Sequence, residues 1–187
     1  MIKIAITGNI ASGKSQVEKM LADMGYPVFD ADKIAHSVLD SINNFYDYDV
    51  FTEGKIDRKK LGKLVFENKE LKNKLEEIVH PKVKEAILKI FDDYSDKTLL
   101  FVSVPLLFET DFHTLFDKII LVTTGEDIRL KRLMDRNNLT KEEALKRIKS
   151  QIPESEKLSG ADFVIENNTT LESLKNQLNK VIESIAS

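Results

Sequence analysis

Residues 8–15 read Gly8-Asn9-Ile10-Ala11-Ser12-Gly13-Lys14-Ser15 and match the pattern G-x-x-x-x-G-K-[ST] at every specified position. An apolar run, Ile2–Thr7, comes directly before this stretch. Between Val17 and Met24, after the stretch, apolar residues recur at helical spacing. A strand before the pattern and a helix after it are the context in which it forms a phosphate-binding loop. The stretch therefore predicts such a loop within an α/β fold.

The residue types of this loop suit a dense anion. Successive backbone N–H groups can donate to phosphate oxygens, and the positive end of the following helix adds to the field. Gly8 and Gly13 permit backbone angles and close approaches that a Cβ would obstruct. Lys14 is expected to reach the β- and γ-phosphates of ATP, and Ser15 to bind Mg²⁺. The expected nucleotide contacts are Gly8, Asn9, Ile10, Ala11, Ser12, Gly13, Lys14, Ser15 and Gln16. The alternative is a chance glycine-rich turn between a strand and a helix.

Five short apolar runs alternate with helical patterns along most of the chain. The runs are Ile2–Thr7, Pro27–Asp30, Leu99–Val104, Lys118–Thr123 and Phe163–Ile165. Most are continuously apolar, as strands covered on both faces are, and their alternation with helices predicts a five-stranded parallel sheet. Capping-box spacing at Thr140 and Glu143, and again at Thr169 and Glu172, predicts two helix starts. Gly25 is a plausible helix stop.

One long segment departs from this alternation. Between Ala31 and Lys97 there is no good strand, and the periodicity predicts helices over Leu61–Phe66, Leu71–Val79 and Val83–Tyr94, with a break at Pro81. A crossover between two strands does not need so much helix. We expect a helical insertion that carries part of a substrate site; the alternative is a decorated crossover without a role.

Composition and charge limit the class of protein. The chain has 187 residues, no cysteine and a formal net charge of −3. These values fit a reducing compartment and do not suggest nucleic-acid binding. The first residues lack a signal peptide, and the longest apolar run, Leu99–Phe108, falls short of the ~20 residues of a membrane helix. We expect a soluble cytoplasmic protein with no membrane or nucleic-acid partner. The oligomeric state stays open, a monomer included.

The motifs around the loop favour a kinase over a switch or a motor. Neither N-K-x-D nor D-x-x-G, the patterns of GTP switches, occurs in the chain, and Leu99–Val104 contains no Asp. Asp30 and Asp32 follow the second strand, at the sheet edge where ligands of parallel sheets gather. Asp32 is the candidate to accept the proton of an attacking hydroxyl, and Asp30 a weaker candidate for metal or water. The alternative is that either one caps a helix starting at Lys33.

A basic segment follows the fourth strand. Residues 129–149 hold eight Lys or Arg and three acids, a local excess of +5 (8 − 3). Arg132, Arg136 and Arg147 have the spacing of a lid whose guanidinium groups stabilise charge on a transferring phosphoryl group. The alternative is a solvated basic helix face.

Taken together, these motifs resemble the dephospho-coenzyme A kinase family, and they span nearly the whole chain. The matching pieces are the loop, Asp30–His36, Asp57-Arg58 with Leu61, Val65 and Phe66, His80-Pro81, Val104–Glu109, the residues Arg132, Arg136, Arg147 and Gln151, and Ala161–Asn167. Asn9 and Ala11 stand where the family often has glycine, and Arg129 where it often has glutamine. At the two loop positions we expect no loss of binding, whereas a contact of Arg129 with adenine or lid is in doubt.

The resemblance implies a fold similar to nucleoside monophosphate kinases. The nucleotide-binding core would comprise residues 1–30, 98–128 and 161–187, the coenzyme A-binding region 31–97, and the lid 129–160. It implies transfer of the γ-phosphate of ATP, with Mg²⁺, to the ribose 3′-hydroxyl of dephospho-coenzyme A, the last step of coenzyme A synthesis. Implied catalytic residues are Asp32, Lys14 and Arg136; nucleotide contacts include Arg132, Arg136 and Arg147; substrate contacts are Asp32, Arg58, His80, Leu107 and Glu109.

Alternatives remain for the function and for single residues. The chain could be a kinase of another small acceptor, such as a nucleoside, a nucleotide or a sugar acid, or a nucleotide-binding module without phosphotransfer. Arg58 could instead form a surface ion pair, His80 could be a packed helix-end residue, and Leu107 could belong to the core. GTP is not excluded as the donor, although no motif reads guanine.

Overall fold

The computed structural model describes residues 1–41, 50–52 and 55–187, and of Lys55 and Phe66 it describes the backbone only. The chain divides into two compact units, which are treated separately below. The larger unit comprises residues 1–30 and 94–187, and the smaller unit residues 31–93. Among the residues that the structure describes, no helix is both long and apolar enough to cross a bilayer.

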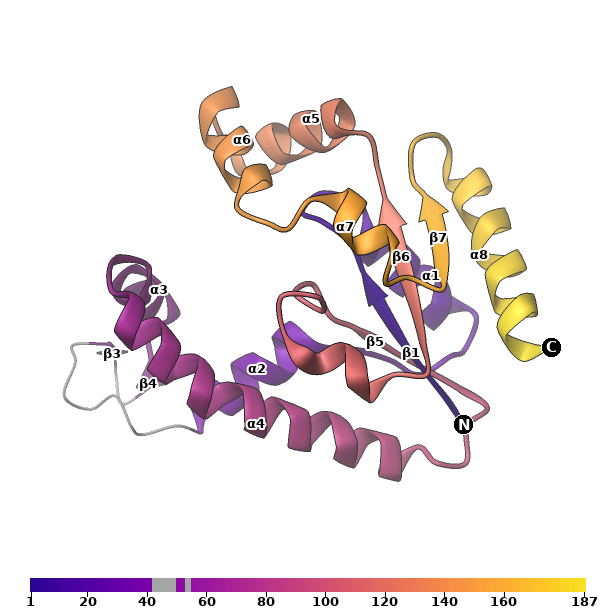
Figure 1. Cartoon of the computed structure of the whole chain (residues 1–187), viewed down its shortest axis with the longest axis horizontal. Coiled ribbons are helices and arrows are strands. Elements are labelled where there is room, and N and C mark those ends of the chain that lie inside the picture. The colour runs from indigo at the N-terminus through magenta and orange to yellow at the C-terminus, as the bar shows by residue number, and fades with distance from the viewer. Residues whose placement is uncertain (42–49, 53–54) are drawn as a thin grey trace. The chain divides into compact units, whose positions relative to one another are not determined.

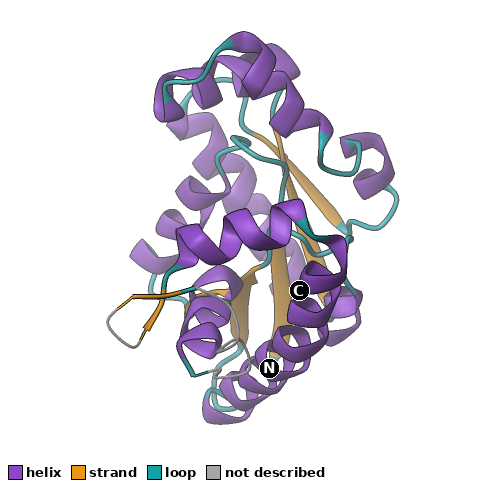
Figure 2. Ribbon diagram, turned by 90° about the vertical axis from the view of Figure 1, so that its left-hand side faces the viewer, coloured by secondary structure: helices purple, strands orange, loops and turns teal. Residues whose placement is uncertain are grey.

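The larger unit is built on a five-stranded parallel sheet in the order β2-β5-β1-β6-β7. Figure 2 shows strands in orange among the helices. Its strands are β1 (Ile2–Thr7), β2 (Val28–Asp30), β5 (Leu99–Ser103), β6 (Lys118–Thr123) and β7 (Phe163–Glu166). The predicted sheet is therefore confirmed, with strand ends displaced by one residue at most. β1 is the central strand, pairing with β5 through Ile4 and Phe101 and with β6 through Ile4 and Lys118. Because all strands run the same way, their carboxyl ends meet at one edge of the sheet.

Helices cover this sheet and continue from its strands. α1 (Lys14–Asp23) and α8 (Leu171–Ala186) contact each other, and α8 lies alongside β7 (Figure 1). The chain leaves the end of β6 into α5 (Glu126–Asn137), followed by α6 (Lys141–Lys149) and α7 (Glu154–Leu158). A 3-10 helix, η1 (Asp111–Leu115), precedes β6. Apolar side chains from α1, α8 and four of the strands form one buried core, including Ile4, Ile6, Val17, Leu21, Phe101, Ile120, Val122, Ile165, Leu174 and Leu178.

The predicted helix boundaries of this unit are correct in two cases and wrong in one. α1 is followed by Gly25 in a left-handed conformation (φ 88°), and α6 begins with the predicted capping box of Thr140 and Glu143. For α8 the cap is Thr170, whose side chain accepts from the backbone N–H of Ser173. The prediction of Thr169 as the cap was one residue too early, because neighbouring threonines offer the same hydroxyl and only backbone geometry selects between them.

The smaller unit consists of helices and one short hairpin. Its elements are α2 (Ala31–Asp40), β3 (Phe51–Thr52), β4 (Lys55–Ile56), α3 (Arg58–Glu67) and α4 (Lys69–Asp93). α4 packs against both α2 and α3. The antiparallel β3–β4 pair was not predicted, since strands of two residues carry no readable periodicity.

The predicted break at Pro81 is wrong, because α4 runs through it as one helix of 25 residues. A proline inside a helix removes one hydrogen bond and crowds the preceding turn. The two halves of α4 nevertheless bury side chains at one continuous spacing of four residues, from Val79 through Val83 and Ile87 to Phe91. A break would turn one half of this stripe away from its partners, so burial outweighs the cost of the proline.

A buried ion pair joins two distant segments of the larger unit. The side chain of Lys157 on α7 is completely buried, and its Nζ donates to Oε1 of Glu109 at 2.8 Å. Nearby, a Cβ placed on Gly160 would collide with the ring of Phe108. The chain after β5 and the chain before β7 are thus held together by one buried charge pair and one close glycine contact.

A second buried basic residue lies on α5. Arg129 is 6% exposed, and its Nε and Nη1 find no hydrogen-bond partner among the described residues. Burial raises the pKa of the half-buried Glu154 carboxyl above its ordinary value of 4.5, while the Arg129 charge and the backbone N–H of Thr124 counteract this rise. Glu154 is therefore a group whose charged form is disfavoured by folding.

Replacing Glu109 by glutamine should destabilise the protein strongly. The substitution leaves the ammonium of Lys157 buried without its counter-charge, and breaking a buried pair on one side costs about 3 kcal/mol or more. Urea unfolding monitored by circular dichroism measures the loss. Glu76→Gln is the matched control, since Glu76 pairs with Lys72 on the surface of α4 and should change stability little. Equal stability of both variants would contradict the structural role of the Lys157–Glu109 pair.

Replacing Glu154 by glutamine should make stability less dependent on pH. A carboxyl whose pKa is raised by folding binds protons better in the folded state, so its unfavourable contribution appears as pH rises above about 4.5. Glu154→Gln should therefore gain stability over the wild type at pH 7.5 and lose this gain near pH 4. Partial solvent screening keeps the gain below about 1 kcal/mol. Urea unfolding at both pH values tests it, with Glu183→Gln on α8 as the exposed control; a gain that grows toward low pH would refute the assignment.

Candidate active site

The phosphate loop lies between β1 and α1, and two of its glycines are required by space. Gly13 stands before the first turn of α1 with a left-handed backbone (φ 89°), and a Cβ there would collide with the side-chain amide of Asn167. A Cβ on Gly8 would lie 2.5 Å from the carbonyl oxygen of Val122 and 2.6 Å from Oγ of Ser12. Both glycines therefore let the loop approach β6 and the end of β7 more closely than any side chain would allow.

Ala11 and Asn9, the two loop positions at which the resemblance predicts glycine, have distinct structural roles. Ala11 adopts a left-handed backbone (φ 63°), a conformation that glycine adopts at lower cost. Asn9 is buried, and its Nδ2 donates to the carbonyl oxygen of Ile152 at 3.3 Å. The backbone N–H of Ile10 donates to Oε1 of Gln151 at 2.7 Å. Residues 9 and 10 thus connect the loop to the segment between α6 and α7.

The carbonyl groups of the loop are held from behind by side chains at the ends of β6 and β7. Oγ1 of Thr124 and Nδ2 of Asn167 donate to the carbonyl oxygen of Ser12 at 2.8 and 2.9 Å. Nδ2 of Asn167 also donates to Oε1 of Gln16 at 3.1 Å. Thr124 was missed in the sequence; the available signal was its place directly after a strand, at the ligand-binding edge of the sheet.

The three arginines of the predicted lid differ in their surroundings. Nη1 of Arg132 lies 3.4 Å from the carbonyl oxygen of Ala11, and its Nη2 donates to the carbonyl oxygen of Asn167 at 3.2 Å. Arg136 is exposed in the last turn of α5, where its Nε donates to Oδ1 of Asn137 at 3.0 Å. Arg147 is exposed on α6. The structure therefore brings Arg132 to the loop and leaves Arg136 and Arg147 at the solvent surface.

An apolar cluster fixes the α5–α6 pair beside the loop. Leu133, Ala144 and Ile148 are buried between the two helices, and the partly buried Ile10 and Ala11 pack against them. α5 and α6 pack against each other, and α6 begins with its capping box. The helix pair contacts the loop through Ile10 and Ala11. The basic segment that was predicted to form a lid therefore packs directly against the phosphate loop.

The loop lysine is engaged with two residues that sequence reasoning missed. Nζ of Lys14 lies 2.7 Å from Oε1 of Glu18, one turn further along α1, and also contacts Oγ of Ser103 at the end of β5. Oγ of Ser103 in turn donates to Oε1 of Glu18 at 2.6 Å. Asp30 is the register neighbour of Ser103 on β2, so both lie at the same edge of the sheet. The signal for Glu18 was its i,i+4 spacing from Lys14.

The residues at the loop fit a magnesium ion that is bound mainly by phosphates. Ser15 is exposed at the start of α1, and its hydroxyl forms no hydrogen bond with the described residues. Within that part of the chain, no group of three or more His, Cys, Asp or Glu side chains could hold a metal by itself. Mg²⁺ usually takes few protein ligands and completes its shell with water and phosphate oxygens. Ser12 also presents a buried Oγ without a partner among these residues.

The residues predicted for the acceptor divide between the two units. In the smaller unit, Asp32 lies in the first turn of α2, which begins at Ala31 and not at Lys33 as predicted. An aspartate inside the first turn cannot be the cap of that helix, so the capping alternative for Asp32 is wrong. Arg58 forms an exposed ion pair with Asp40, its Nη2 lying 3.2 Å from Oδ2.

Three further candidates for substrate contact lie in surroundings that the sequence did not reveal. His80 lies inside the continuous α4, half-buried, and not at a helix end. Leu107 is completely buried, so it belongs to the core and offers no surface to a ligand in this structure. Glu109, predicted to contact substrate or metal, is engaged by the buried Lys157. Periodicity could not reveal the surroundings of Leu107 and Glu109 because the Val104–Glu109 segment is neither strand nor helix.

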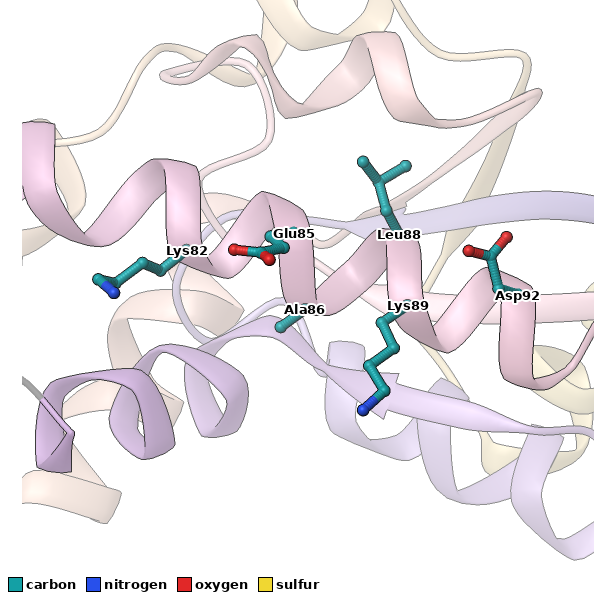
Figure 3. A pocket seen from close by; sticks show the side chains of 6 residues that line it. All are labelled: Lys82, Glu85, Ala86, Leu88, Lys89 and Asp92. Atoms are coloured by element: carbon teal, nitrogen blue, oxygen red, sulfur yellow. The ribbon is translucent and has the colours of Figure 1, made fainter.

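The smaller unit also carries a hollow of about 500 Å³ along α4. Figure 3 shows the side chains that line it, with Leu88 and Lys89 pointing to different sides of the helix. The lining residues are Lys82, Glu85, Ala86, Leu88, Lys89 and Asp92. Two positive and two negative side chains leave no net charge, so the hollow itself does not select a phosphorylated ligand.

Comparisons with known proteins agree on one family. The family model described as dephospho-CoA kinase (CoaE) matches residues 2–173. A dephospho-CoA kinase of Listeria monocytogenes is 44% identical over 96% of this chain and 95% of its own length, and one of Fusobacterium nucleatum is 42% identical over 97% of each. The crystal structure of TT1252 from Thermus thermophilus aligns with a TM-score of 0.87 at 36% identity, covering 98% of this chain and 97% of that one.

Two other solved structures separate family from fold. Dephospho-CoA kinase from Campylobacter jejuni aligns with a TM-score of 0.77 at 37% identity, over 98% of this chain and 96% of that one. A shikimate kinase from Bacteroides thetaiotaomicron aligns with a TM-score of 0.58 at only 13% identity, over 100% and 99% of the two chains, and shows the shared fold alone. With a family model over most of its length and relatives above 40% identity, this chain belongs to the dephospho-CoA kinase family.

Proposed function

We propose that this protein transfers the γ-phosphoryl group of ATP to the ribose 3′-hydroxyl of dephospho-coenzyme A, giving coenzyme A and ADP in the last step of coenzyme A synthesis. The carrying observation is the complete phosphate loop, with Gly8 and Gly13 packed where no side chain fits, in a chain of the dephospho-CoA kinase family. Because ATP is the donor, the cytoplasm is the expected place of work.

In this proposal the loop binds and orients the donor. Backbone N–H groups of residues 8–15 and the positive end of α1 hold the phosphates, and Lys14 moves to the β- and γ-phosphate oxygens. Ser15 would hold Mg²⁺, which would neutralise part of the phosphate charge. Arg132, Arg136 and Arg147 form the basic side of the site, and Arg136 is the one proposed to stabilise charge on the transferring group.

The acceptor hydroxyl is proposed to be prepared by Asp32. Its carboxylate accepts the hydroxyl proton as the new oxygen–phosphorus bond forms, while the bond from phosphorus to the β,γ-bridging oxygen breaks and ADP leaves. Residues 31–97, with Arg58 and His80, are proposed to bind the rest of the acceptor, and residues 129–160 to act as a lid. Opening Arg58 for a phosphate requires loss of its exposed pair with Asp40, which is a weak interaction.

An acceptor panel with a coupled ADP-release assay tests the proposed reaction. The wild type should turn over dephospho-coenzyme A far faster than nucleosides, nucleotides or sugar acids, and Lys14→Ala should reduce kcat at least about 100-fold because a donor to the transition-state charge is lost. Lys175→Ala, on the exposed side of α8, is the charge-matched control. Faster turnover of a nucleotide would favour another small-molecule kinase, and nucleotide binding without any turnover would favour a binding module.

Replacing Arg136 by alanine should lower kcat while leaving the fold intact. Arg136 is exposed and makes only a local hydrogen bond, so the substitution removes little packing. We expect a loss of about 100-fold or more in kcat, as for other guanidinium groups that stabilise a transferring phosphoryl group. Steady-state kinetics and thermal unfolding measure the two effects, with Lys131→Ala on α5 as the control. Unchanged kcat would remove Arg136 from the catalytic set.

A further inference from the structure

The ammonium of Lys14 is engaged by two side chains of the larger unit, those of Glu18 and Ser103. It contacts Oε1 of Glu18 at 2.7 Å and Oγ of Ser103, and Ser103 donates to the same carboxylate oxygen at 2.6 Å. The side chains of Lys14 and Glu18 are only 17% and 19% exposed. An ion pair this sheltered is less screened by water than a surface pair, so its charge interaction matters more.

This arrangement conflicts with the proposed role of Lys14 in binding the β- and γ-phosphates. A triphosphate held by the loop needs the ammonium for its own oxygens, and a carboxylate bonded to the same ammonium competes for it. Glu18 also brings a negative charge close to the place where further negative charge must bind. Such a carboxylate lowers affinity for the phosphates unless it yields the lysine or becomes neutralised.

We propose that Glu18 is a positioning residue that holds the ammonium of Lys14 in the nucleotide-free protein, and that the hydroxyl of Ser103 stabilises this ion pair. When the nucleotide binds, the ammonium exchanges the Glu18 carboxylate for phosphate oxygens. Glu18 thereby compensates a partly buried cation when no phosphate does so, at the expense of nucleotide affinity. This inference rests on the proposed role of the loop as a triphosphate site.

The sign of the affinity change in Glu18→Gln tests the proposal. The amide keeps the shape and can still accept hydrogen bonds, but it lacks the charge that competes with phosphate. Isothermal titration with ATP in the presence of EDTA should show binding at least about fivefold tighter than in the wild type, since a sheltered charge pair contributes no less than the upper end of the range for surface pairs. With excess Mg²⁺ the gain should shrink, because the ion already neutralises part of the phosphate charge. Adenosine, which has no phosphate, should bind both proteins alike.

Two variants separate the charge of Glu18 from packing. Glu183→Gln removes one negative charge from the far end of α8 and should leave ATP affinity unchanged. Ser103→Ala removes the steadying hydroxyl but keeps the carboxylate, and should tighten ATP binding less than Glu18→Gln does. A Ser103→Ala effect as large as that of Glu18→Gln would assign the effect to packing and overturn the proposal.

Other outcomes also decide the matter. Weaker binding of ATP without magnesium in Glu18→Gln would show that Glu18 supports the loop and does not compete with phosphate. A loss of affinity confined to ATP with Mg²⁺ would show that the Glu18 carboxylate helps to bind the metal. Either result overturns the proposed positioning role of Glu18. If the wild type binds ATP and phosphorylates dephospho-coenzyme A in these cases, the proposed function stands without it. If the wild type binds no ATP, both fail together.

Discussion

The structure depends on the directions in which the backbone N–H and carbonyl groups of the phosphate loop point. For backbone N–H groups of this loop to face a bound phosphate, carbonyl groups between them must face outward and find donors there. Thr124, Asn167 and Arg132 supply those donors to the carbonyls of Ala11 and Ser12. These donors come from segments more than a hundred residues away in the sequence. The loop is therefore shaped by the parallel sheet that brings the ends of β6 and β7 to the end of β1.

In the larger unit, buried and partly buried lysines are compensated by specific acidic partners. The buried Lys157 on α7 pairs with the partly exposed Glu109 in the irregular segment after β5, and Lys14 is compensated by Glu18 and Ser103. Such pairs specify position more than they add stability, since desolvation offsets much of their attraction. The small net charge of the chain, −3, does not reveal this organisation, which is why a count of charges predicted only the absence of a nucleic-acid surface.

The residues around the loop also explain how the chain departs from its family's glycine-rich loop without losing the loop's form. Ala11 retains a left-handed backbone, and the apolar contact of Ile10 and Ala11 with the α5–α6 pair compensates for that conformation. Asn9 uses its side chain to reach Ile152. The loop and the basic segment that follows β6 therefore pack against each other. These side-chain contacts hold the loop in a backbone conformation that glycine would adopt more easily.

The sequence by itself determined the phosphate loop, the five parallel strands, the helical nature of residues 58–93 and the family, because each depends on local patterns of residue type and spacing. Tertiary structure alone decided the rest. Continuous burial along α4 carried the helix through Pro81, and backbone geometry chose Thr170 over Thr169 as a cap. Ser103, which contacts Lys14, and the partners of Glu109 and Ser12 come from distant segments. A pattern that reads neighbours along the chain carries no record of contacts made through space.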